Sequence, residues 1–319
     1  MREYVLVVGC GMMGSGIAAM SALAGNKTFL YDVDKEHTAS GKSKAEACID
    51  LRVENGLNTK EEGDRAKALL EENTNLEDAC EKTCMVIEAI IENVGIKQDM
   101  FARLDSLLPV EVPICSNTSG LRITDISAKC VHPERTVTTH FWLPAHLVPL
   151  VEVVMGDKTD EAVAVKVRDT LKNWKKSPVL VKKDLPGQLA NRIFQAIIRE
   201  SIDIVDSGLA SAEDVDTAIS CGMAMRFPVW GPLMHLDDIG LQLGMDVQNT
   251  VLPSICADKK ASPYIENLVK EGNLGAKTGK GFYDWSKMDV KKCEEKRNQF
   301  IIEAVKVKTK LDEEIDVRK

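Results

Sequence analysis

One histidine and one glutamate stand out as candidate proton-transfer groups. His140 ends the apolar run 136–140, and Glu152 lies inside the apolar run 147–154. An isolated carboxylate in a buried strand is costly, and histidine is the side chain that exchanges a proton most readily near neutral pH. Either residue alone could be structural, but a pair explains both positions. The pattern therefore predicts a His140–Glu152 pair that can accept and return a proton.

A glycine-rich turn near residue 1 predicts a dinucleotide site. The apolar run 4–8 leads into a GxGxxG turn over residues 9–14 and then into a helical pattern. The three glycines allow a tight turn, a close approach to pyrophosphate and close packing of helix on strand, with the anion at the helix N-terminus. Asp32 follows the next apolar run, 28–31, where a carboxylate would bind a ribose 2′-hydroxyl and repel a 2′-phosphate. These residues predict NAD rather than NADP; the turn alone also fits a flavin, which no second motif favours.

The elements that must position these residues alternate between strand-like and helical patterns through the first half of the chain. Such alternation predicts βαβ units and a parallel sheet that is covered on both faces. The predicted strands cover residues 4–8, 28–31, 84–90, 113–115, 136–140, 151–154 and 179–181. A polar stretch between residues 34 and 82, broken at 55–56 and 62–63, predicts a helical hairpin between the second and third strands.

The second half of the chain has a different character. After Pro186-Gly187 the strand-like runs end, and helical periodicity appears at 189–205 and 212–219. We therefore predict two domains, 1–185 and 186–319, the second of them all-α. The charged tail from 290 to 319 is typical of an amphipathic helix, either a solvated surface helix or a binding segment.

Composition narrows the class of protein. The chain has 319 residues, of which 44% are hydrophobic and 28% charged, and no run is long enough for a membrane helix. Its net charge of −8 disfavours nucleic acid and anionic lipid as partners and favours a small molecule. The nine cysteines lack metal-site or redox spacing, and no export signal is visible, so we predict reduced thiols, no metal and a cytoplasmic location.

Taken together, the motifs resemble those of the 3-hydroxyacyl-CoA dehydrogenase family, over almost the whole chain. The glycine turn, His140 and Glu152 are three of the family's landmarks, and the others occur in the family's order. They are the segment 88–93 together with Lys97, the segment 116–119, the segment 186–187 followed by 191–192, and the segment 277–283. The resemblance implies a Rossmann-like NAD-binding domain with an inserted helical hairpin, joined to an all-α substrate and dimerisation domain. It also implies a homodimeric, NAD-dependent enzyme that interconverts the 3-hydroxyl and 3-keto forms of a 3-hydroxyacyl compound, most simply L-3-hydroxyacyl-CoA.

The resemblance also implies roles for individual residues. His140 would be the catalytic base, Glu152 would orient its ring, Ser119 would bind the substrate oxygen, and Asn191 would be an active-site residue. The implied cofactor-binding residues are Gly9, Gly11, Met12, Met13, Gly14, Asp32, Glu92, Lys97, Asn117 and Lys277. Plainer roles stay open: Ser119 and Asn191 could be turn or cap residues, and Glu92 and Lys97 a solvated ion pair.

Three departures from the family pattern concern the substrate. Leu143 stands where the family commonly has asparagine, so a polar contact is lost; nearby His146 is either a substitute donor or a bystander. The fatty-acyl branch offers a serine and basic residues of the hairpin to the nucleotide of coenzyme A, whereas segment 48–55 here reads CIDLRVEN, which is poor phosphate-binding chemistry. The segment 222–227, with Arg226, is similar to the branch of L-gulonate 3-dehydrogenase, lambda-crystallin and carnitine dehydrogenase.

Arg226 is thus a candidate anchor for a free carboxylate, or else part of an interface ion pair. The alternatives to an acyl-CoA substrate are therefore a small free 3-hydroxy acid or, from another class, a non-catalytic crystallin-like NAD-binding protein. A phosphogluconate-type dehydrogenase fits less well, because that group relies on a catalytic lysine.

Overall fold

The computed structural model describes residues 2–315 and shows two compact units, which divide between Arg192 and Ile193. The division lies later than the predicted domain boundary at 185/186. The reason is that the segment after Pro186 is bonded to the first unit: Gln188 Nε2 donates to Thr118 O, and the backbone N–H of Leu189 donates to Glu152.

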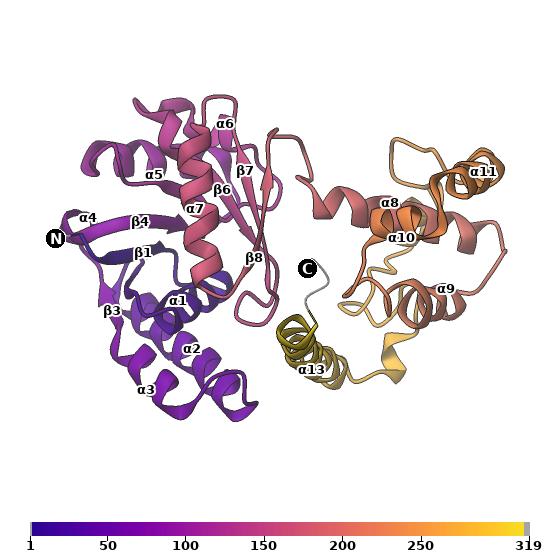
Figure 1. Cartoon of the computed structure of the whole chain (residues 1–319), viewed down its shortest axis with the longest axis horizontal. Coiled ribbons are helices and arrows are strands. Elements are labelled where there is room, and N and C mark those ends of the chain that lie inside the picture. Colours follow the sequence, from indigo (N-terminus) through magenta and orange to yellow (C-terminus); the bar gives the residue numbers. More distant parts are fainter. Residues whose placement is uncertain (1, 316–319) are drawn as a thin grey trace. The chain divides into compact units, whose positions relative to one another are not determined.

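An eight-stranded sheet forms the centre of the first unit (Figure 1). Its strands are β1 (Tyr4–Val8), β2 (Lys27–Tyr31), β3 (Leu70–Asn73), β4 (Thr83–Glu88), β5 (Ile114–Ser116), β6 (Thr136–Phe141), β7 (Leu150–Met155) and β8 (Ser177–Val181). The strand order is β3-β2-β1-β4-β5-β6-β7-β8, and every neighbouring pair is parallel except β6 with β7. The antiparallel pair brings the two ends of the short 142–149 connection together.

Helices cover both faces of this sheet. They are α1 (Met12–Leu23), α2 (Lys35–Glu54), α3 (Lys60–Ala68), α4 (Leu76–Lys82), α5 (Val94–Leu107), α6 (Ile123–Ile126) and α7 (Glu161–Asn173). Side chains of β1 alternate between the two hydrophobic cores, with Val5 and Val7 in one and Leu6 and Val8 in the other. Because successive strand residues point to opposite faces, the sheet is buried on both sides, as a parallel sheet requires.

The inserted region differs from its prediction in two details. The helical hairpin is present as α2 and α3, but the predicted break at 62–63 lies inside α3, which a capping box of Thr59 and Glu62 begins. Gly63 serves close packing there, since a Cβ would lie 2.6 Å from Val53 Cγ2. Strand β3 was missed because its sequence is polar and only Leu70 is buried; β3 lies at the sheet edge, where no apolar alternation is needed.

The second unit is helical, as predicted. It holds most of α8 (Ala190–Asp206), α9 (Ala212–Ala218), α10 (Pro232–Ile239), α11 (Leu241–Val251), α12 (Pro263–Lys270) and α13 (Val290–Glu314). The last residues of the predicted tail helix, 316–319, lie outside the described residues. None of the helices within residues 2–315 combines the length and apolar character that a membrane crossing requires.

Candidate active site

The predicted proton-transfer pair is formed by the antiparallel strands β6 and β7. His140 and Glu152 stand directly opposite each other in the ladder, and His140 Nδ1 lies 2.8 Å from Glu152 Oε2. The Glu152 side chain is fully buried, whereas the His140 side chain keeps 12% of its surface exposed. Because Nδ1 is engaged by the carboxylate, Nε2 is the ring nitrogen left for a substrate.

Glu152 accepts hydrogen bonds from three donors besides His140. Trp142 Nε1 lies 3.0 Å from Oε2, and the backbone N–H groups of Leu189 and Ala190 each lie 2.8 Å from Oε1. The last two donors are at the start of α8, where unpaired N–H groups and the helix dipole favour an anion. Burial would raise the pKa of Glu152, but the bonds from His140, Ala190, Trp142 and Leu189 lower it to about 2. Glu152 therefore carries its charge throughout the neutral range.

These extra donors were missed from the sequence. The distance from the Trp142 indole to Glu152 depends on the fold of the 142–149 connection, which no local sequence pattern indicates. Backbone N–H groups carry no residue-type signal, so residues 189 and 190 could not be recognised without the tertiary structure.

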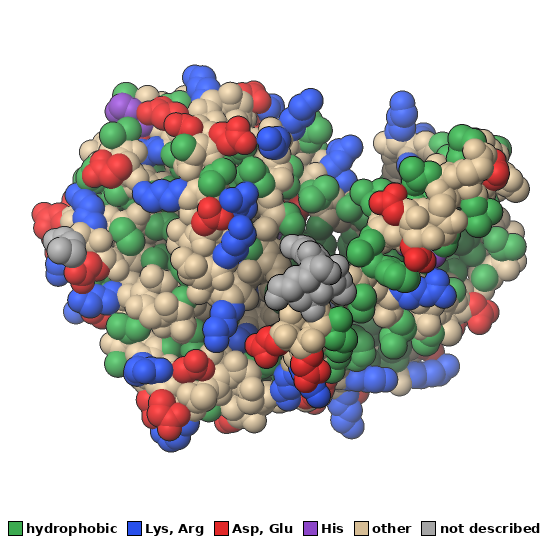
Figure 2. Space-filling view, in the orientation of Figure 1, with side chains coloured by type: hydrophobic (Ala, Val, Ile, Leu, Met, Phe, Trp, Pro, Cys, Tyr) green, Lys and Arg blue, Asp and Glu red, His purple; other side chains and the backbone are tan. Residues whose placement is uncertain are grey.

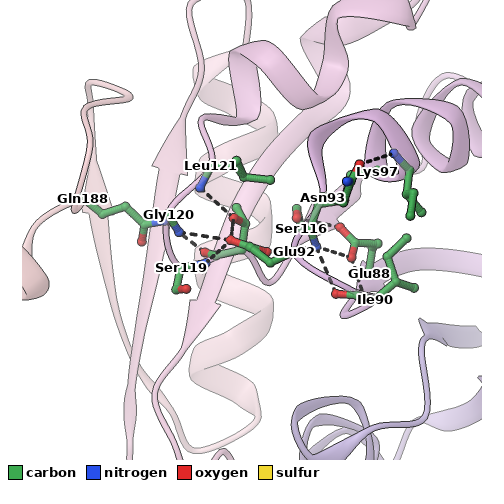
Figure 3. A network of polar contacts seen from close by, with 12 residues as sticks. Glu88, Ile90, Glu92, Asn93, Lys97, Ser116, Ser119, Gly120, Leu121 and Gln188 are labelled. Atoms are coloured by element: carbon green, nitrogen blue, oxygen red, sulfur yellow. Dashed lines mark hydrogen bonds and ion pairs between the residues drawn. The ribbon is translucent and has the colours of Figure 1, made fainter. Parts of the chain in front are cut away.

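Glu92 holds the turn that carries Ser119. Its Oε1 accepts from Thr118 Oγ1 at 2.5 Å and from the backbone N–H groups of Ser119 and Gly120 at 3.2 Å each (Figure 3). Burial tends to raise the pKa of Glu92, but these bonds and the nearby Lys97 ammonium lower it. Ser119 itself is exposed. The predicted cofactor residue Glu92 thus fixes the position of the predicted substrate residue Ser119.

Lys97 is enclosed rather than solvated. Its side chain is 1% exposed, and its Nζ lies 2.6 Å from Glu88 Oε1 and 3.4 Å from Glu92 Oε2. Glu88, a buried residue at the end of β4, also accepts from Ser116 Oγ and from the backbone N–H of Ile90, both at 2.7 Å. The alternative of a solvated Glu92–Lys97 pair is therefore wrong, because Lys97 is buried against Glu88, which sequence reasoning had not singled out as a functional residue.

Three amides border the same region. Asn117 Oδ1 accepts from the backbone N–H of Phe141 at 2.9 Å, which ties the end of β5 to the residue after His140. Gln188 extends toward the 119–120 turn and donates to Thr118 O, while its buried Oε1 has no hydrogen-bond partner among residues 2–315 (Figure 3). Asn191 lies in the first turn of α8, beside the Ala190 N–H that binds Glu152.

The glycine turn has the geometry that a pyrophosphate requires. Gly9 has φ +99°, and a Cβ on it would lie 2.7 Å from Ala89 O. A Cβ on Gly14 would lie 1.8 Å from Gly9 O, whereas one on Gly11 would meet nothing within 4 Å. Gly11 is also the N-cap of α1 and brings no capping side chain to the first turn. The turn thus leaves backbone N–H groups open at the N-terminus of α1, and the residues fit a dinucleotide.

Asp32 supports this turn from β2. Its Oδ2 accepts from the backbone N–H of Cys10 at 2.7 Å and its Oδ1 from that of Val33 at 2.8 Å. Each oxygen keeps a lone pair for a ribose hydroxyl. Of the two methionines in the turn, Met12 is 71% exposed, and Met13 packs against the hydrophobic core.

His146 forms none of the hydrogen bonds that Glu152 accepts within residues 2–315. It packs against α1, where a Cβ on Gly16 would lie 3.6 Å from its Nδ1. Burial, Arg52 and Lys176 lower the pKa of His146 to about 4, so the ring is neutral near pH 7. This placement fits the bystander alternative, and Leu143 itself is half exposed.

The two remaining predicted site residues, Arg226 and Lys277, belong to the second unit. Both side chains are exposed, and neither forms an ion pair with any residue in the described range 2–315. The isolated bridge between Gly275 and Lys280 closes the loop that carries Lys277. Within the part of the chain that is described, no group of His, Cys, Asp and Glu side chains is placed to hold a metal ion.

Comparison with known proteins decides the family. A model of the 3-hydroxyacyl-CoA dehydrogenase NAD binding domain matches residues 4–185, and a model of the C-terminal domain of the same family matches 187–285. The chain belongs to the 3-hydroxyacyl-CoA dehydrogenase family. It is therefore an NAD-dependent oxidoreductase that acts on a CH–OH group, which confirms the predicted family, cofactor and Rossmann-like fold class.

Individual relatives act on different substrates. The chain is 36% identical to a probable 3-hydroxybutyryl-CoA dehydrogenase of Bacillus subtilis over 89% of this chain and 97% of that protein. It is 30% identical to 5-formyl-3-hydroxy-2-methylpyridine 4-carboxylate 5-dehydrogenase of Mesorhizobium japonicum, over 95% of this chain and 97% of that protein. A crystal structure of an enzyme of the latter name, described as an NAD+ dependent dismutase, matches with a TM-score of 0.87 at 28% identity, covering 97% of this chain and 99% of that one.

Proposed function

We propose that the His140–Glu152 pair carries out the proton transfer in an NAD-dependent interconversion of the 3-hydroxyl and 3-keto forms of a 3-hydroxyacyl compound. The observation that carries this proposal is the buried, ionised Glu152 bonded to Nδ1 of a histidine whose Nε2 is left available. Bound NAD supplies the hydride acceptor. His140 Nε2 takes the hydroxyl proton during oxidation and returns it during reduction, while Glu152 stabilises the positive ring.

We propose that the other predicted residues act around this pair. Ser119 binds the substrate oxygen, and Asn191 lines the reacting centre. The turn 9–14 and Asp32 hold the pyrophosphate and ribose of the cofactor. Glu92, Lys97 and Asn117 support the cofactor side of the site, with the Lys97 ammonium acting through Glu92 since it is enclosed. Lys277 in the second unit completes the proposed cofactor set.

Replacing His140 by Gln tests the proton-transfer role. The variant is expected to lose turnover by about 10²- to 10⁴-fold, since general-base catalysis contributes that much, while NADH binding measured by fluorescence stays unchanged. His132→Gln is a matched control, because His132 forms an exposed pair with Glu134 at 3.0 Å. Undiminished turnover in the His140 variant would refute the assignment.

For the substrate, we propose a small free hydroxy acid. The supporting observation is Arg52, the basic residue of segment 48–55, which is buried and donates to His146 O and Asn58 instead of facing a ligand phosphate. On the same hairpin, Lys67 pairs with Asp50 and Lys60 with Asp64. Arg226, exposed and without an ion pair among residues 2–315, is the proposed anchor for the free carboxylate.

An L-3-hydroxyacyl-CoA is the second candidate. It is supported by the relatives that are named 3-hydroxybutyryl-CoA dehydrogenases and by Lys42 and Lys44, which lie earlier on α2 without an ion pair in the described part of the chain. It is the substrate that the sequence favours most simply.

A substrate panel separates the two candidates. NADH absorbance would be followed with acetoacetyl-CoA and with free 3-oxo acids of matched chain length. A free-acid enzyme should prefer the acids, and Arg226→Ala should then raise KM for the acid by about tenfold or more, the usual cost of losing a charge-assisted bond. Arg297→Ala, on exposed α13, is the control. A preference for the thioester, or an Arg226 variant equal to the control, would reject the free-acid proposal.

We further propose that the enzyme is a cytoplasmic homodimer. Exposed apolar side chains gather on the second unit, where Figure 2 shows them in green. They include Leu233 and Met234 on α10 and Leu241, Leu243 and Met245 on α11. A patch of this kind is typical of an association surface. Light scattering should report a dimer, and Leu241→Asp should shift it toward the monomer; a wild-type monomer would end this proposal.

A further inference from the structure

A second set of buried polar contacts holds the connection between β6 and β7. Lys176, just before β8, is 6% exposed, and its Nζ donates to Ala145 O at 2.5 Å and to Val148 O at 2.9 Å. Both carbonyls belong to the segment 142–149, which joins His140 to Glu152. Lys176 therefore bridges two points of the segment that separates the two residues of the active-site pair.

Arg52 holds the same segment through a third carbonyl. It lies in the last turn of α2, is 8% exposed, and donates from Nη1 to His146 O at 2.6 Å and from Nε to Asn58 Oδ1 at 2.8 Å. The segment also rests on α1, because a Cβ on Gly16 would lie 3.2 Å from Ala145 Cβ. Three carbonyls within residues 145–148 thus accept from two basic side chains, and the segment is fixed against the helix that begins at the cofactor turn.

These two basic side chains lack the usual compensation for burial. Neither forms an ion pair with an acidic residue in the described range. Glu62 is linked to Arg52 only through Asn58, which accepts from Arg52 and donates to Glu62 Oε2 at 2.9 Å. Burial and Arg52 together lower the pKa of Lys176 to about 7, and burial lowers that of Arg52 to about 10. Since isolated buried charge is costly, the bonds to the carbonyls are the main interaction that these side chains make.

The segment is linked directly to the active-site pair at its first residue. Trp142 Nε1 donates to Glu152 Oε2, and the ring of Phe141, the neighbour of His140, lies 5.7 Å below Lys176 Nζ. A movement of residues 145–148 would therefore displace Phe141 and Trp142, the two residues that follow His140 in the chain. Such a movement changes the geometry of proton transfer without removing any group that touches the substrate.

We propose that Lys176 and Arg52 are positioning residues, which fix the 142–149 segment and thereby keep His140 and Glu152 aligned for proton transfer. The inference rests on the proposed function of that pair. It assigns a role to two buried basic side chains, one on α2 and one just before β8. Within residues 2–315 their hydrogen bonds go to residues other than His140 and Glu152.

The test combines a conformational and a kinetic measurement. Lys176→Met removes the donor, Lys176→Gln keeps a neutral donor, and Lys175→Gln changes the exposed neighbour as a control. In hydrogen–deuterium exchange, peptides covering 141–149 should exchange about tenfold faster in Lys176→Met than in the wild type, since two buried carbonyls lose their partner.

For the kinetics, NADH oxidation would be followed with whichever of acetoacetyl-CoA and free 3-oxobutyrate the wild type reduces. Turnover should fall by roughly 10- to 100-fold in Lys176→Met, because a small misalignment of the reacting groups lowers the rate by that much. KM for NADH should stay within about twofold of the wild type. Lys176→Gln should recover most of both losses, and Arg52→Met should repeat the exchange change at residue 146.

The outcomes separate this inference from the function on which it rests. Unchanged exchange at 141–149 would overturn it whatever the activity, and faster exchange with wild-type kcat would overturn the positioning role. If Lys176→Met fails to fold, Arg52→Met decides by the same criteria. Failure of the proposed function would show instead as full turnover in His140→Gln, a result that leaves the exchange experiment untouched.

Discussion

Two buried charged groups lie at the β6–β7 connection, and they are stabilised in opposite ways. Glu152, in β7 just after the segment, accepts from His140, Trp142 and two backbone N–H groups at the start of α8. Lys176 donates to two carbonyls inside the segment and has Arg52, a like charge, as its charged neighbour. The pKa of Glu152 is lowered to about 2 and that of Lys176 to about 7.

The difference shows what keeps a buried group ionised. Four donors and a helix N-terminus outweigh the burial of Glu152, so its charge is fixed at every physiological pH. Carbonyl dipoles do not outweigh the burial of Lys176 beside Arg52, so its charge varies near neutral pH. We therefore expect Glu152 to be the permanent electrostatic partner of His140, and Lys176 to be a donor whose charge depends on pH.

Among the variants that test this comparison, the largest effect is expected from Glu152→Gln. The amide is neutral and presents an N–H group to His140 Nδ1, so kcat should fall by about 10³- to 10⁴-fold, as in other enzymes whose histidine loses its carboxylate. Steady-state kinetics with the panel substrate would measure it. Glu134→Gln, which neutralises the carboxylate of an exposed His–Glu pair, should stay near wild type. Equal losses of kcat in the two variants would show that the His140–Glu152 pair has no greater role in catalysis than the exposed His132–Glu134 pair.

Acid should destabilise the protein through Glu152. Its folded-state pKa of about 2 is below the ordinary value of 4.5, so the unfolded chain binds the proton first. The stabilisation is complete above about pH 4.5 and is lost as pH falls toward 2, with a limit of ~3 kcal/mol. Urea unfolding from pH 2.5 to 6 should show the wild-type advantage over Glu152→Gln shrinking in this window. A constant difference would mean that the Glu152 pKa is ordinary.

Lys176 should act in a separate, higher pH window. Its folded-state pKa of about 7 is below the ordinary 10.5, so above pH 7 the unfolded chain binds a proton that the folded protein does not. Stability of the wild type relative to Lys176→Met should therefore rise with pH from about 7 toward 10, by ~1 kcal/mol per unit. Urea unfolding at pH 6, 7, 8 and 9 tests this. A flat or falling difference would show that Lys176 stays charged in the fold.

The smallest effect is expected where the 142–149 segment rests on α1. A Cβ on Gly16 would meet Ala145 Cβ at 3.2 Å and His146 N at 3.5 Å, so Gly16→Ala should shift the segment slightly. We expect kcat to fall by about two- to fivefold, equivalent to ~1 kcal/mol or less. Gly222→Ala is the control, since nothing lies within 4 Å of its added Cβ. Equal kcat in both variants would show that the segment tolerates the displacement.

The sequence predicted the buried strands of the sheet better than its edge strand and the direction in which its strands pair. Strands such as β1 and β6 were found within a residue or so of their observed ends, because both faces are buried and their apolar runs are continuous. The polar edge strand β3 was missed, and the sheet was expected to be parallel throughout. The antiparallel β6–β7 pair depends on a short connection whose path no local pattern encodes.

For the site, residue types with strong chemical preferences were predictable. The pairing of His140 with Glu152 followed from the cost of burying each alone, and the glycine turn followed from backbone geometry. The roles of Glu88, Trp142 and Lys176 were not predicted, since each depends on contacts between segments distant in the chain or on backbone atoms.

The sequence by itself determined the family, the cofactor class and the pairing of His140 with Glu152, because glycine, histidine and buried carboxylate each restrict the local structure or its chemistry. Only the tertiary structure decided how the charges are held. The start of α8 donates N–H groups to Glu152, Lys97 is enclosed beside Glu88, and Arg52 donates to the 142–149 segment. Electrostatic stabilisation depends on burial and on the number of donors around a group, and both are properties of the fold rather than of the residue.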